Sequence, residues 1–410
     1  MVWYAIMITY DKALTILRKE ASHFQPAKEM VSLSAINGRI STADIISPLN
    51  VPSFDNSAMD GFAVRMDDFE NNRPTLKVKS RIIAGDVVGN FELSSGTCCE
   101  IMTGATIPKG ANSIIPVEWA NRTGGLVSFS VTPRKDEFIR QAGSDFRQGV
   151  SVIKSGTLLS THHVLPLAAL GIGKVEVYSK PKVAFIPTGR EIVENFNQEL
   201  GEGQIYNSTL PFAEAFLSGS HVEFLPQKTI ADDPHAFQTT VSKLAHVGVS
   251  LIISSGAVSA GSHDFIYSSL EEIGATILFH KVAIRPGKPI LFARLPNGIF
   301  YLGLPGNPIS TAVGLRFFVR PLVAALMQQK PEQSLLARVK TPLSKRSGLR
   351  LFLKAKINVS SQGVLEVSFL DGQESYKTSP FLMMNSWAVL PETMTAVVEN
   401  DVIEVFPLDS

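Results

Sequence analysis

The sequence predicts a multidomain protein of the α/β plus β class: a mostly parallel α/β sandwich, an inserted β domain, a small helical and extended N-terminal domain, and a C-terminal β barrel. Three observations lead to this prediction. The chain has 410 residues, more than one hydrophobic core usually fills. Residues 181–330 alternate apolar strand patterns with helical ones. Residues 51–140 and 331–410 instead show short alternating runs between turn residues.

The N-terminal domain is expected to be discontinuous, over residues 7–50 and 141–180. Thr9 is a suitable cap for an amphipathic helix over residues 11–21, and a second helical pattern runs from Ser160 to Leu170. Between these two patterns, runs such as 126–131 are typical of short strands. The β domain at residues 51–140 is therefore predicted to be an insertion.

The α/β segment is expected to form its sheet from strands near residues 183–186, 222–225, 251–254, 277–279 and 299–302. Helices are expected to begin near Ser208, Asp232, Asp264 and Asn307. In such sheets a ligand binds outside the carboxyl ends of the strands, so the loops that follow the strands are the place to look for a site.

Composition excludes several classes of function. Lys plus Arg at 38 nearly balance Asp plus Glu at 37, which argues against binding to nucleic acid or to a membrane surface. The longest apolar stretch, 309–327, contains Arg316, Arg320 and Pro321, so no membrane span is predicted. The N-terminus lacks a basic region and a cleavage site, and a cytoplasmic location is expected.

The cysteines and histidines argue against a metal site built from sulfur or nitrogen. Cys98 and Cys99 are adjacent, so they can form neither an ordinary disulfide nor the separated ligand pairs of a zinc site. Both are expected to be strand residues. The eight histidines show no metal-ligand spacing.

Two turn-rich loops, residues 281–289 and 304–310, suggest an anion site. The first carries Lys281, Arg285 and Lys288. The second ends in Asn307 before Pro308, an expected side-chain cap that would leave free N–H groups at a helix start. Together the loops suit a phosphorylated ligand. The alternative is that the Pro-Gly pairs mark ordinary turns and the cations are merely solvated.

Seven short motifs carry a family resemblance: residues 51–63, 101–105, 188–191, 203–206, 255–259, 286–289 and 304–308. In this order, over nearly the whole chain, they resemble the molybdopterin molybdenumtransferase family (the MoeA and gephyrin E-domain group). The resemblance implies an α/β sandwich of the molybdopterin-binding type in a four-domain, dimeric subunit. It also implies an enzyme that inserts molybdate into adenylylated molybdopterin with Mg²⁺ and releases AMP. A molybdopterin adenylyltransferase is a possible upstream partner.

The chemistry asks for cations or N–H donors around the oxyanions and carboxylates around Mg²⁺. Asp232 and Asp264 are the expected metal ligands, although Asp232 could instead be a plain helix cap. The catalytic candidates that the resemblance implies are Asp60, Thr103, Asp145 and Glu191. The expected substrate-binding residues are Ser255, Gly256, Ser259, Lys281, Arg285, Lys288, Pro305, Gly306, Asn307, Arg350 and Ser375.

Each candidate also has an ordinary structural interpretation. Asp60 precedes Gly61 in a typical tight-turn pair, Glu191 could be a surface acid at a helix start, and residues 255–259 could form a plain turn. The family resemblance favours the functional interpretation. In a dimer, the loops that carry Asp60, Thr103 and Asp145 could reach the α/β domain of the other subunit.

Several positions depart from the family pattern, and three of the departures, at Ser144, Arg190 and Asn207, replace an acid. The full set is Ser144, Arg190, Asn207, Ala257 and Arg285. Fewer acids would ease anion entry but weaken retention of Mg²⁺. A non-catalytic molybdopterin-binding or scaffolding paralogue is therefore a second hypothesis beside the transferase. The residues do not discriminate between molybdate and tungstate, since the two ions share a charge and nearly a size.

Overall fold

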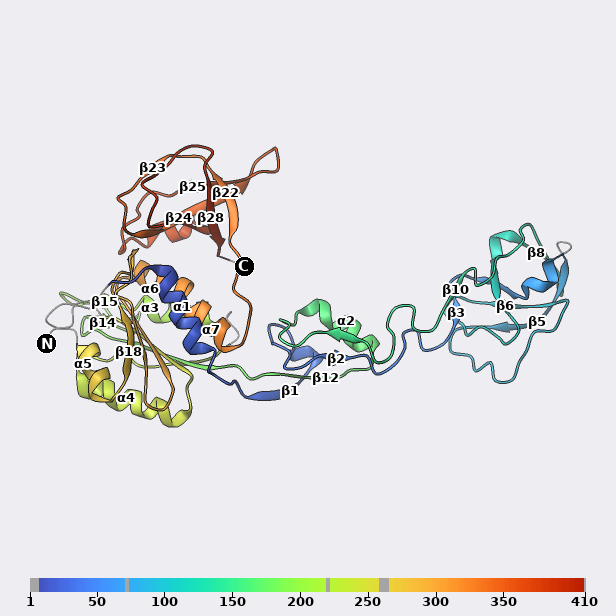
Figure 1. Cartoon of the computed structure of the whole chain (residues 1–410), viewed down its shortest axis with the longest axis horizontal. Helices are drawn as coiled ribbons and strands as arrows, with labels where there is room; N and C mark the ends of the chain where they lie inside the picture. Colours follow the sequence, from blue (N-terminus) through green and yellow to red (C-terminus); the bar gives the residue numbers. More distant parts are fainter. Residues whose placement is uncertain (1–6, 71–73, 219–221, 258–264, 409–410) are drawn as a thin grey trace. The chain divides into compact units, whose positions relative to one another are not determined.

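The computed structural model describes residues 7–70, 74–218, 222–257 and 265–408. The chain forms two compact units (Figure 1). The first unit comprises Met1–Glu29, Gly38–Ile40 and Tyr178–Ser410, and the second comprises Met30–Asn37 and Ser41–Val177. The boundaries of the four domains expected from the sequence remain a prediction.

A six-stranded sheet forms the centre of the first unit. Its order is β16 (Glu223–Pro226), β13 (Lys182–Pro187), β17 (Leu251–Ser255), β21 (Phe300–Leu304), β20 (Leu291–Arg294) and β18 (Thr276–His280). Neighbours from β16 to β21 pair in parallel, whereas β20 is antiparallel to both β21 and β18. The mostly parallel sheet was predicted. Strand β20 was missed because its short apolar run follows the cationic turn at residues 281–289.

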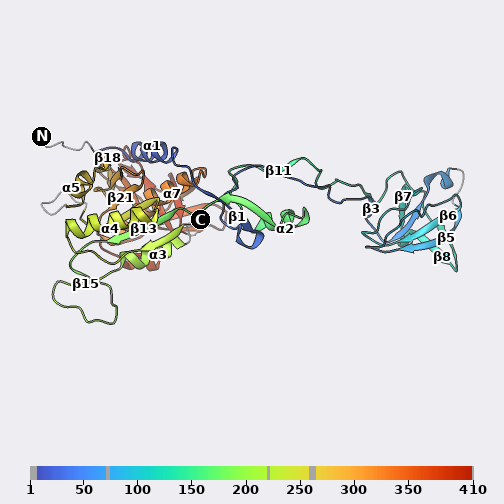
Figure 2. The same cartoon turned by 90° about the horizontal axis from the view of Figure 1, so that it is seen from below.

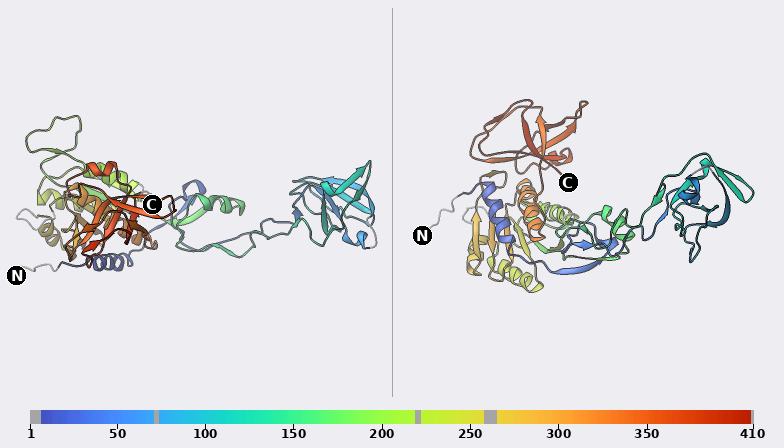
Figure 3. Two further views of the ribbon diagram at one scale, coloured as in Figure 1. Left: turned by 90° about the horizontal axis from the view of Figure 1, so that it is seen from above. Right: turned by 45° about the vertical axis from the view of Figure 1, so that its right-hand side comes forward.

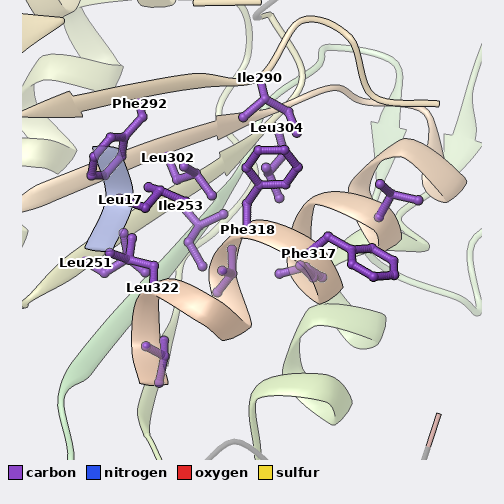
Figure 4. Close-up of a cluster of buried hydrophobic side chains, with 14 of the residues drawn as sticks. Leu17, Leu251, Ile253, Ile290, Phe292, Leu302, Leu304, Phe317, Phe318 and Leu322 are labelled. Atoms are coloured by element: carbon purple, nitrogen blue, oxygen red, sulfur yellow. The ribbon is translucent and has the colours of Figure 1, made fainter. Parts of the chain in front are cut away.

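Helices cover both faces of this sheet (Figure 1). Strand β13 shows why, because Val183 and Phe185 point into one core and Ala184 and Ile186 into the other. The first core, part of which Figure 4 shows, packs against α1 (Tyr10–Ala21), α3 (Thr209–Ser218), α6 (Pro308–Gly314), the π-helix Leu315–Val319 and α7 (Arg320–Leu326). The second core packs against α4 (Pro234–Val247) and α5 (Phe265–Glu272).

Helix α1 belongs to the first unit, whereas the sequence placed residues 11–21 in the N-terminal linking domain. Ala13 and Leu17 are fully buried in the first core, and Thr9 caps the helix as predicted by accepting a hydrogen bond from the Lys12 N–H at 3.3 Å. The apolar stripe of α1 is thus covered by the α/β unit. Periodicity predicted the helix but could not say which core would bury it.

Among the described residues, one helical stretch, Pro308–Leu326, is long and apolar enough to cross a membrane. Its most apolar window is 78% buried inside the protein. The buried Arg316 within it donates two hydrogen bonds of 2.7 Å to the carboxylate of Glu332. This stretch therefore packs as a core helix of the first unit.

The C-terminal part of the first unit is a closed barrel, as predicted. Its strands are β24 (Arg350–Val359), β25 (Leu365–Phe369), β22 (Leu335–Val339), β28 (Val402–Pro407) and β26 (Ser386–Leu390), and β26 pairs back with β24. The short strand β19 (Ile284–Arg285) joins β24 in parallel, with Ile284 opposite Arg350. This pairing ties the cationic loop of residues 281–289 to the barrel.

Shorter elements complete the first unit. Strand β14 (Ile192–Val193) pairs with β15 (Ile205–Tyr206), and β23 (Leu343–Ser344) pairs with β27 (Ala396–Val397). Figure 2 labels β15 on a loop that projects from the α/β layer, and the left view of Figure 3 shows the same loop. A 3₁₀ helix covers Ser379–Leu382.

The second unit contains the predicted inserted β domain as a six-stranded sheet. Its order is β7 (Ser113–Pro116), β4 (Gly61–Val64), β6 (Thr97–Ile101), β5 (Thr75–Ile82), β9 (Leu126–Phe129) and β8 (Ala120–Thr123). Cys98 and Cys99 lie on β6 as buried free thiols, which confirms that they are strand residues. Burial raises the pKa of each thiol to about 12.

The remaining elements between Lys28 and Tyr178 are short. The pairs are β1 (Lys28–Ser32) with β12 (Lys174–Tyr178), β2 (Ile45–Ile46) with β11 (Ser151–Ile153), and β3 (Asn56–Ser57) with β10 (Ile139–Arg140). Helix α2 covers Thr161–Ala169 and begins with a capping box between Ser160 and His163. Three 3₁₀ helices cover Leu33–Ala35, Met66–Phe69 and Val117–Trp119.

Candidate functional site

A cavity of about 1030 Å³ lies in the first unit, where loops follow the carboxyl ends of β13, β17 and β21. Its wall combines loops of the α/β layer with one loop of the barrel. The lining residues come from the segments 188–192, 205–209, 255–257, 285–289, 305–310 and 373–376, and from Asp232. Small-molecule sites typically span roughly 300–1,000 Å³, so a ligand of nucleotide size fits here. The position agrees with the rule for parallel α/β sheets.

The cavity brings together most of the residues that the sequence singled out in this unit. Those in its wall are Glu191, Asp232, Ser255, Gly256, Arg285, Lys288, Pro305, Gly306, Asn307 and Ser375. Within the part of the chain that the structure describes, Lys281 and Arg350 are not in the wall. Ser259 and Asp264 lie outside the described residues.

Two glycines let the loops after β17 and β21 approach each other closely. Gly256 has φ +103°, and a Cβ there would lie 2.6 Å from both the carbonyl oxygen and Oγ1 of Thr188. A Cβ on Gly306 would lie 3.4 Å from the Cα of Gly256. The space at Gly256 therefore excludes a side chain, whereas a Cβ on Gly306 would make an ordinary contact. Ala257, where the family pattern has glycine, takes a positive φ of 46° and still lines the cavity.

A chain of hydrogen bonds lies behind Ser255. The Ser255 and Thr209 hydroxyl oxygens are 3.2 Å apart, and Thr209 Oγ1 donates to Asn207 Oδ1 at 3.3 Å. Asn207 Nδ2 donates to Thr229 Oγ1 at 3.2 Å, which in turn donates to Glu194 Oε1 at 2.6 Å. Each hydroxyl has one proton to donate, and in this chain each can donate it to the next residue on the path from Ser255 to Glu194.

Asn207 thus has a structural explanation at a position where the family commonly has Asp. Its side chain is buried, and Oδ1 also accepts from the Leu210 N–H at 3.0 Å, which caps the start of α3. Asp could make that cap, but it could not donate to Thr229. A carboxylate at this position would also add a second negative charge near Glu194.

Three carboxylates are present in the cavity wall, those of Glu191, Asp232 and Glu374, and the last is paired with Lys377. The sequence left open whether Asp232 is a plain helix cap, and the structure gives that role to Asp233, whose Oδ1 accepts from His235 N at 2.9 Å and Ala236 N at 3.3 Å. Asp232 lies in the wall instead. Glu191 folds back over Gly189, where a Cβ would lie 2.8 Å from each carboxylate oxygen.

The carboxylates of Glu191 and Asp232 are suitable ligands for Mg²⁺ only if the substrate contributes further ligands. Over the described residues, no group of three or more His, Cys, Asp or Glu side chains could hold a metal ion. Mg²⁺ is usually bound by one or two carboxylates together with waters and substrate phosphates. Glu191 and Asp232 fit that pattern.

The cationic side of the wall consists of Arg285 and Lys288. Both side chains are exposed, and their loop is closed by a hydrogen bond of 2.9 Å from Val282 N to the Lys288 carbonyl. Arg285, where the family commonly has Lys, presents a planar fork that can bind two oxygens of one phosphate. Lys281 is half-buried at φ +74°.

The helix start after β21 differs from the prediction. Asn307 occupies the N-cap position of α6, but its side chain makes no capping hydrogen bond. The Ile309 N–H is not free for a ligand, since it donates to the Ser375 carbonyl at 3.1 Å. The Thr311 hydroxyl donates to Pro305 O at 2.6 Å. The barrel loop therefore occupies a donor that the sequence assigned to an anion.

Arg350 lies outside the cavity wall and has protein partners, and its role in binding remains a prediction. Its guanidinium donates two hydrogen bonds of 2.7 and 2.9 Å to Asp11 and one of 3.0 Å to Glu392. It also stacks over the ring of Tyr10 at 4.7 Å. Three of the five N–H donors of Arg350 are thus used by protein carboxylates. The sequence could not show this, because Asp11 lies 339 positions away.

In the second unit, Asp60 and Thr103 form a pair. Asp60 Oδ1 accepts from the Thr103 N–H at 2.7 Å and from its hydroxyl at 2.8 Å. These bonds, the backbone one most strongly, hold the pKa of Asp60 below its ordinary value. Gly61, the next residue and the first of β4, has no room for a side chain, since a Cβ there would lie 2.1 Å from the Ile115 carbonyl oxygen.

The other predicted residues outside the cavity wall are exposed on turns. Asp145 follows Ser144 in a turn whose Asp145 N–H donates to Val51 O at 2.9 Å. Arg190 is exposed next to Glu191. The roles of Asp60, Thr103 and Asp145 remain predictions.

Sequence reasoning missed several wall residues. Tyr206, Thr209, Gln373, Glu374 and Tyr376 all line the cavity. Tyr206 stands within the motif at residues 203–206, so it could have been found. The barrel loop gave only a weak signal, a turn-rich stretch between two strand patterns.

Comparison with known proteins agrees with this geometry. Residues 8–171 match the MoeA N-terminal region (domain I and II), and residues 184–325 match a probable molybdopterin binding domain. The chain is 34% identical over 407 residues to the molybdopterin molybdenumtransferase of Synechococcus elongatus, covering 98% of this chain and 99% of that one. It is 35% identical over 409 residues to that of Haemophilus influenzae, with the same coverage.

A solved structure gives the same result. The molybdopterin biosynthesis moeA protein from Pyrococcus horikoshii OT3 superposes with a TM-score of 0.83 at 26% identity, over 97% of this chain and 99% of that one. The chain therefore belongs to the molybdopterin molybdenumtransferase family, enzymes of molybdenum cofactor biosynthesis.

Proposed function

We propose that this protein inserts molybdate into the dithiolene of adenylylated molybdopterin, in a Mg²⁺-dependent reaction that releases AMP. One observation carries the proposal: a single cavity presents two cations, Arg285 and Lys288, together with carboxylates that include Glu191 and Asp232. Molybdate is a dianion and the pterin nucleotide carries a pyrophosphate, so the substrates need the cations. A hard divalent ion needs the carboxylates.

The residues of the wall act mainly by orienting the two substrates. Arg285 can bind a phosphate through two parallel N–H donors, and Lys288 adds a point charge. The backbone at Gly256 admits the nucleotide closely, since no side chain stands there. Holding both reactants beside each other in a preorganised charged site supplies most of the acceleration. This scheme requires no covalent protein nucleophile.

Glu191 and Asp232 would hold the Mg²⁺, together with substrate oxygens and with Asp264, a predicted ligand outside the described residues. The bound ion supplies the positive charge that activates the pyrophosphate for cleavage. The chain's part is to present these carboxylates to the cavity.

The proposal includes a cytoplasmic homodimer in which Asp60, Thr103 and Asp145 of one subunit complete the cavity of the other. The substrate must come from a molybdopterin adenylyltransferase, because the nucleotide has to be attached first. Subunit mixing tests the dimer. Asp60→Ala and Asp232→Ala homodimers should both be inactive, whereas mixed dimers should regain activity, since one of their two cavities then carries neither change.

The reaction itself is tested by incubating the purified protein with adenylylated molybdopterin, molybdate and Mg²⁺ and measuring AMP by chromatography. AMP release that depends on molybdate and Mg²⁺ is the expected result. Asp232→Ala should abolish it, whereas Asp233→Asn, which keeps a capping side chain next door, should not.

Two other outcomes would contradict the proposal. Tight ligand binding without AMP release would favour the non-catalytic molybdopterin-binding or scaffolding paralogue. Unchanged Mg²⁺ dependence and turnover in Asp232→Ala would contradict the metal assignment alone.

A further inference from the structure

Lys354, on strand β24, is a fully buried lysine. Lysines are almost never fully buried unless they are paired, because removing the ammonium from water is costly. Here Nζ donates to three backbone carbonyls, those of Gly372, Glu374 at 3.2 Å and Lys377 at 3.0 Å. The three protons of the ammonium thus have three acceptors in one loop.

The partners of Lys354 are carbonyl dipoles, not a carboxylate. The side chain of Glu374 is directed to Lys377, whose Nζ lies 2.8 Å from Glu374 Oε1. Burial lowers the pKa of Lys354. An apolar side chain of similar size would fill the same space without this cost. The ammonium differs from such a side chain in that its three hydrogen bonds fix the conformation of the loop, residues 372–377.

The backbone of Lys354 holds the same loop. Its N–H donates to Gln373 Oε1 at 3.0 Å, and its carbonyl accepts from Gln373 Nε2 at 2.9 Å. Gln373 Nε2 also donates to Leu370 O at 2.7 Å. Lys354 therefore fixes the loop from two directions, through its side chain and through its main chain.

This loop is the barrel's contribution to the cavity. Gln373, Glu374, Ser375 and Tyr376 line the wall. The Ser375 carbonyl meets the Ile309 N–H at 3.1 Å, which attaches the loop to the start of α6. The loop is held by the barrel on one side and by the α/β layer on the other, so its position sets the width of the cavity.

We infer that Lys354 is a positioning residue for the substrate site: its buried ammonium holds residues 372–377 in the conformation that presents Ser375 and Tyr376 to the ligand. The inference rests on the proposed function, since it takes this cavity to be the molybdopterin site. Lys354 touches no substrate itself and acts only through the loop.

The test compares Lys354→Met and Lys354→Arg with Lys356→Met, a control that removes an exposed lysine from the same strand. Hydrogen exchange is measured on the amides of residues 370–377, and KM and kcat for adenylylated molybdopterin are measured separately. Lys354→Met should exchange faster in this loop and raise KM about tenfold, the factor for one lost hydrogen bond of about 1.4 kcal/mol. The value of kcat should change much less.

Lys354→Arg keeps a buried cation with several donors and should recover part of the wild-type KM, whereas Lys356→Met should match the wild type. Normal loop exchange or a normal KM in folded Lys354→Met would overturn the inference, even if its melting temperature fell. If that variant does not fold, Lys354→Gln is judged by the same two readouts. The exchange measurement needs no substrate, so a failure of AMP release in the wild type would count against the proposed function alone.

Discussion

Residues 281–289 and strand β24 pair with each other through β19, and both carry cations that could serve an anion. Arg285 and Lys288 are exposed in the cavity wall. Arg350 and Lys354 are instead engaged by the protein itself, by two carboxylates and by three carbonyls. A cation's partners, not its place in a motif, decide whether it can bind a ligand.

The difference follows from solvation. A cation largely buried on β24, such as Arg350 or Lys354, needs hydrogen-bond acceptors from the protein, because burial removes the water that would otherwise solvate its charge. A cation on the rim of the cavity stays hydrated until an anion replaces that water. The first kind contributes to the stability of the fold and the second kind to binding. The predictions below separate these two contributions.

The largest expected effect is on turnover. Lys288→Ala should reduce AMP release about 10²–10³-fold, the usual loss for one donor aimed at a developing charge. The melting temperature should not change, because the side chain is exposed. Lys281→Met, in the same loop but outside the wall, should lose far less, and the exposed Lys330→Ala serves as a control. An equal loss in Lys281→Met would break the comparison.

The backbone under the cavity is tested by Gly256→Ala. Its φ of +103° and the 2.6 Å approach to Thr188 should make the change cost roughly 3 kcal/mol of unfolding free energy. Gly298→Ala is the matched control, since Gly298 also has a positive φ, +84°, but open space around it. Its cost should be about 1 kcal/mol in urea unfolding. Equal costs would mean that the contact with Thr188 contributes nothing.

Arg350→Met should act on stability rather than on binding. Breaking its ion pairs should cost about 2 kcal/mol, less than a fully buried pair, because Asp11 is 72% exposed. Unfolding in urea measures the cost, with exposed Arg346→Met as the control. The KM for adenylylated molybdopterin should stay the same, and a large rise in KM would restore Arg350 as a ligand-binding candidate.

The smallest expected effect is on the pKa of Asp60, a carboxylate that, like the cations of β24, is hydrogen-bonded by the protein. Thr103→Val removes one of the two donors to Asp60, so the pKa of Asp60 should rise slightly but stay below its ordinary value of about 3.9. The backbone donor, the stronger cause, remains. A carboxyl titration by NMR measures this, with exposed Thr123→Val as the control.

The sign of the linked stability change follows from the lowered pKa. The fold favours the ionised Asp60, so this stabilisation is present above the pKa of the unfolded chain and is lost as pH falls through the folded value. Thr103→Val should therefore lose less stability on acidification than the wild type does. A pKa of Asp60 that does not move in the variant would show that the hydroxyl contributes nothing.

Much of the fold follows from local pattern. Runs of apolar residues at 183–186 and 251–253 predicted buried parallel strands, since such strands contact a core on each face. The family motifs predicted where the loops of the cavity would come from. Glycines such as Gly256 stand where two backbones approach, and only glycine fits there. The sequence alone determined the strands and the positive φ of Gly256, because these depend on neighbouring residues and on local backbone conformation, whereas the approach of Thr188 to Gly256 is a tertiary contact.

The tertiary structure decided which groups of the site are free to act. In the folded chain Asp233 caps α4, whereas Asp232 lies in the cavity wall. The Ser375 carbonyl accepts a hydrogen bond from the Ile309 N–H. The tertiary structure also brought Asp11 to Arg350 across 339 positions. Local periodicity says where a side chain can point. Whether its charge meets a protein partner or a ligand depends on contacts between distant segments, which exist only after the core has formed.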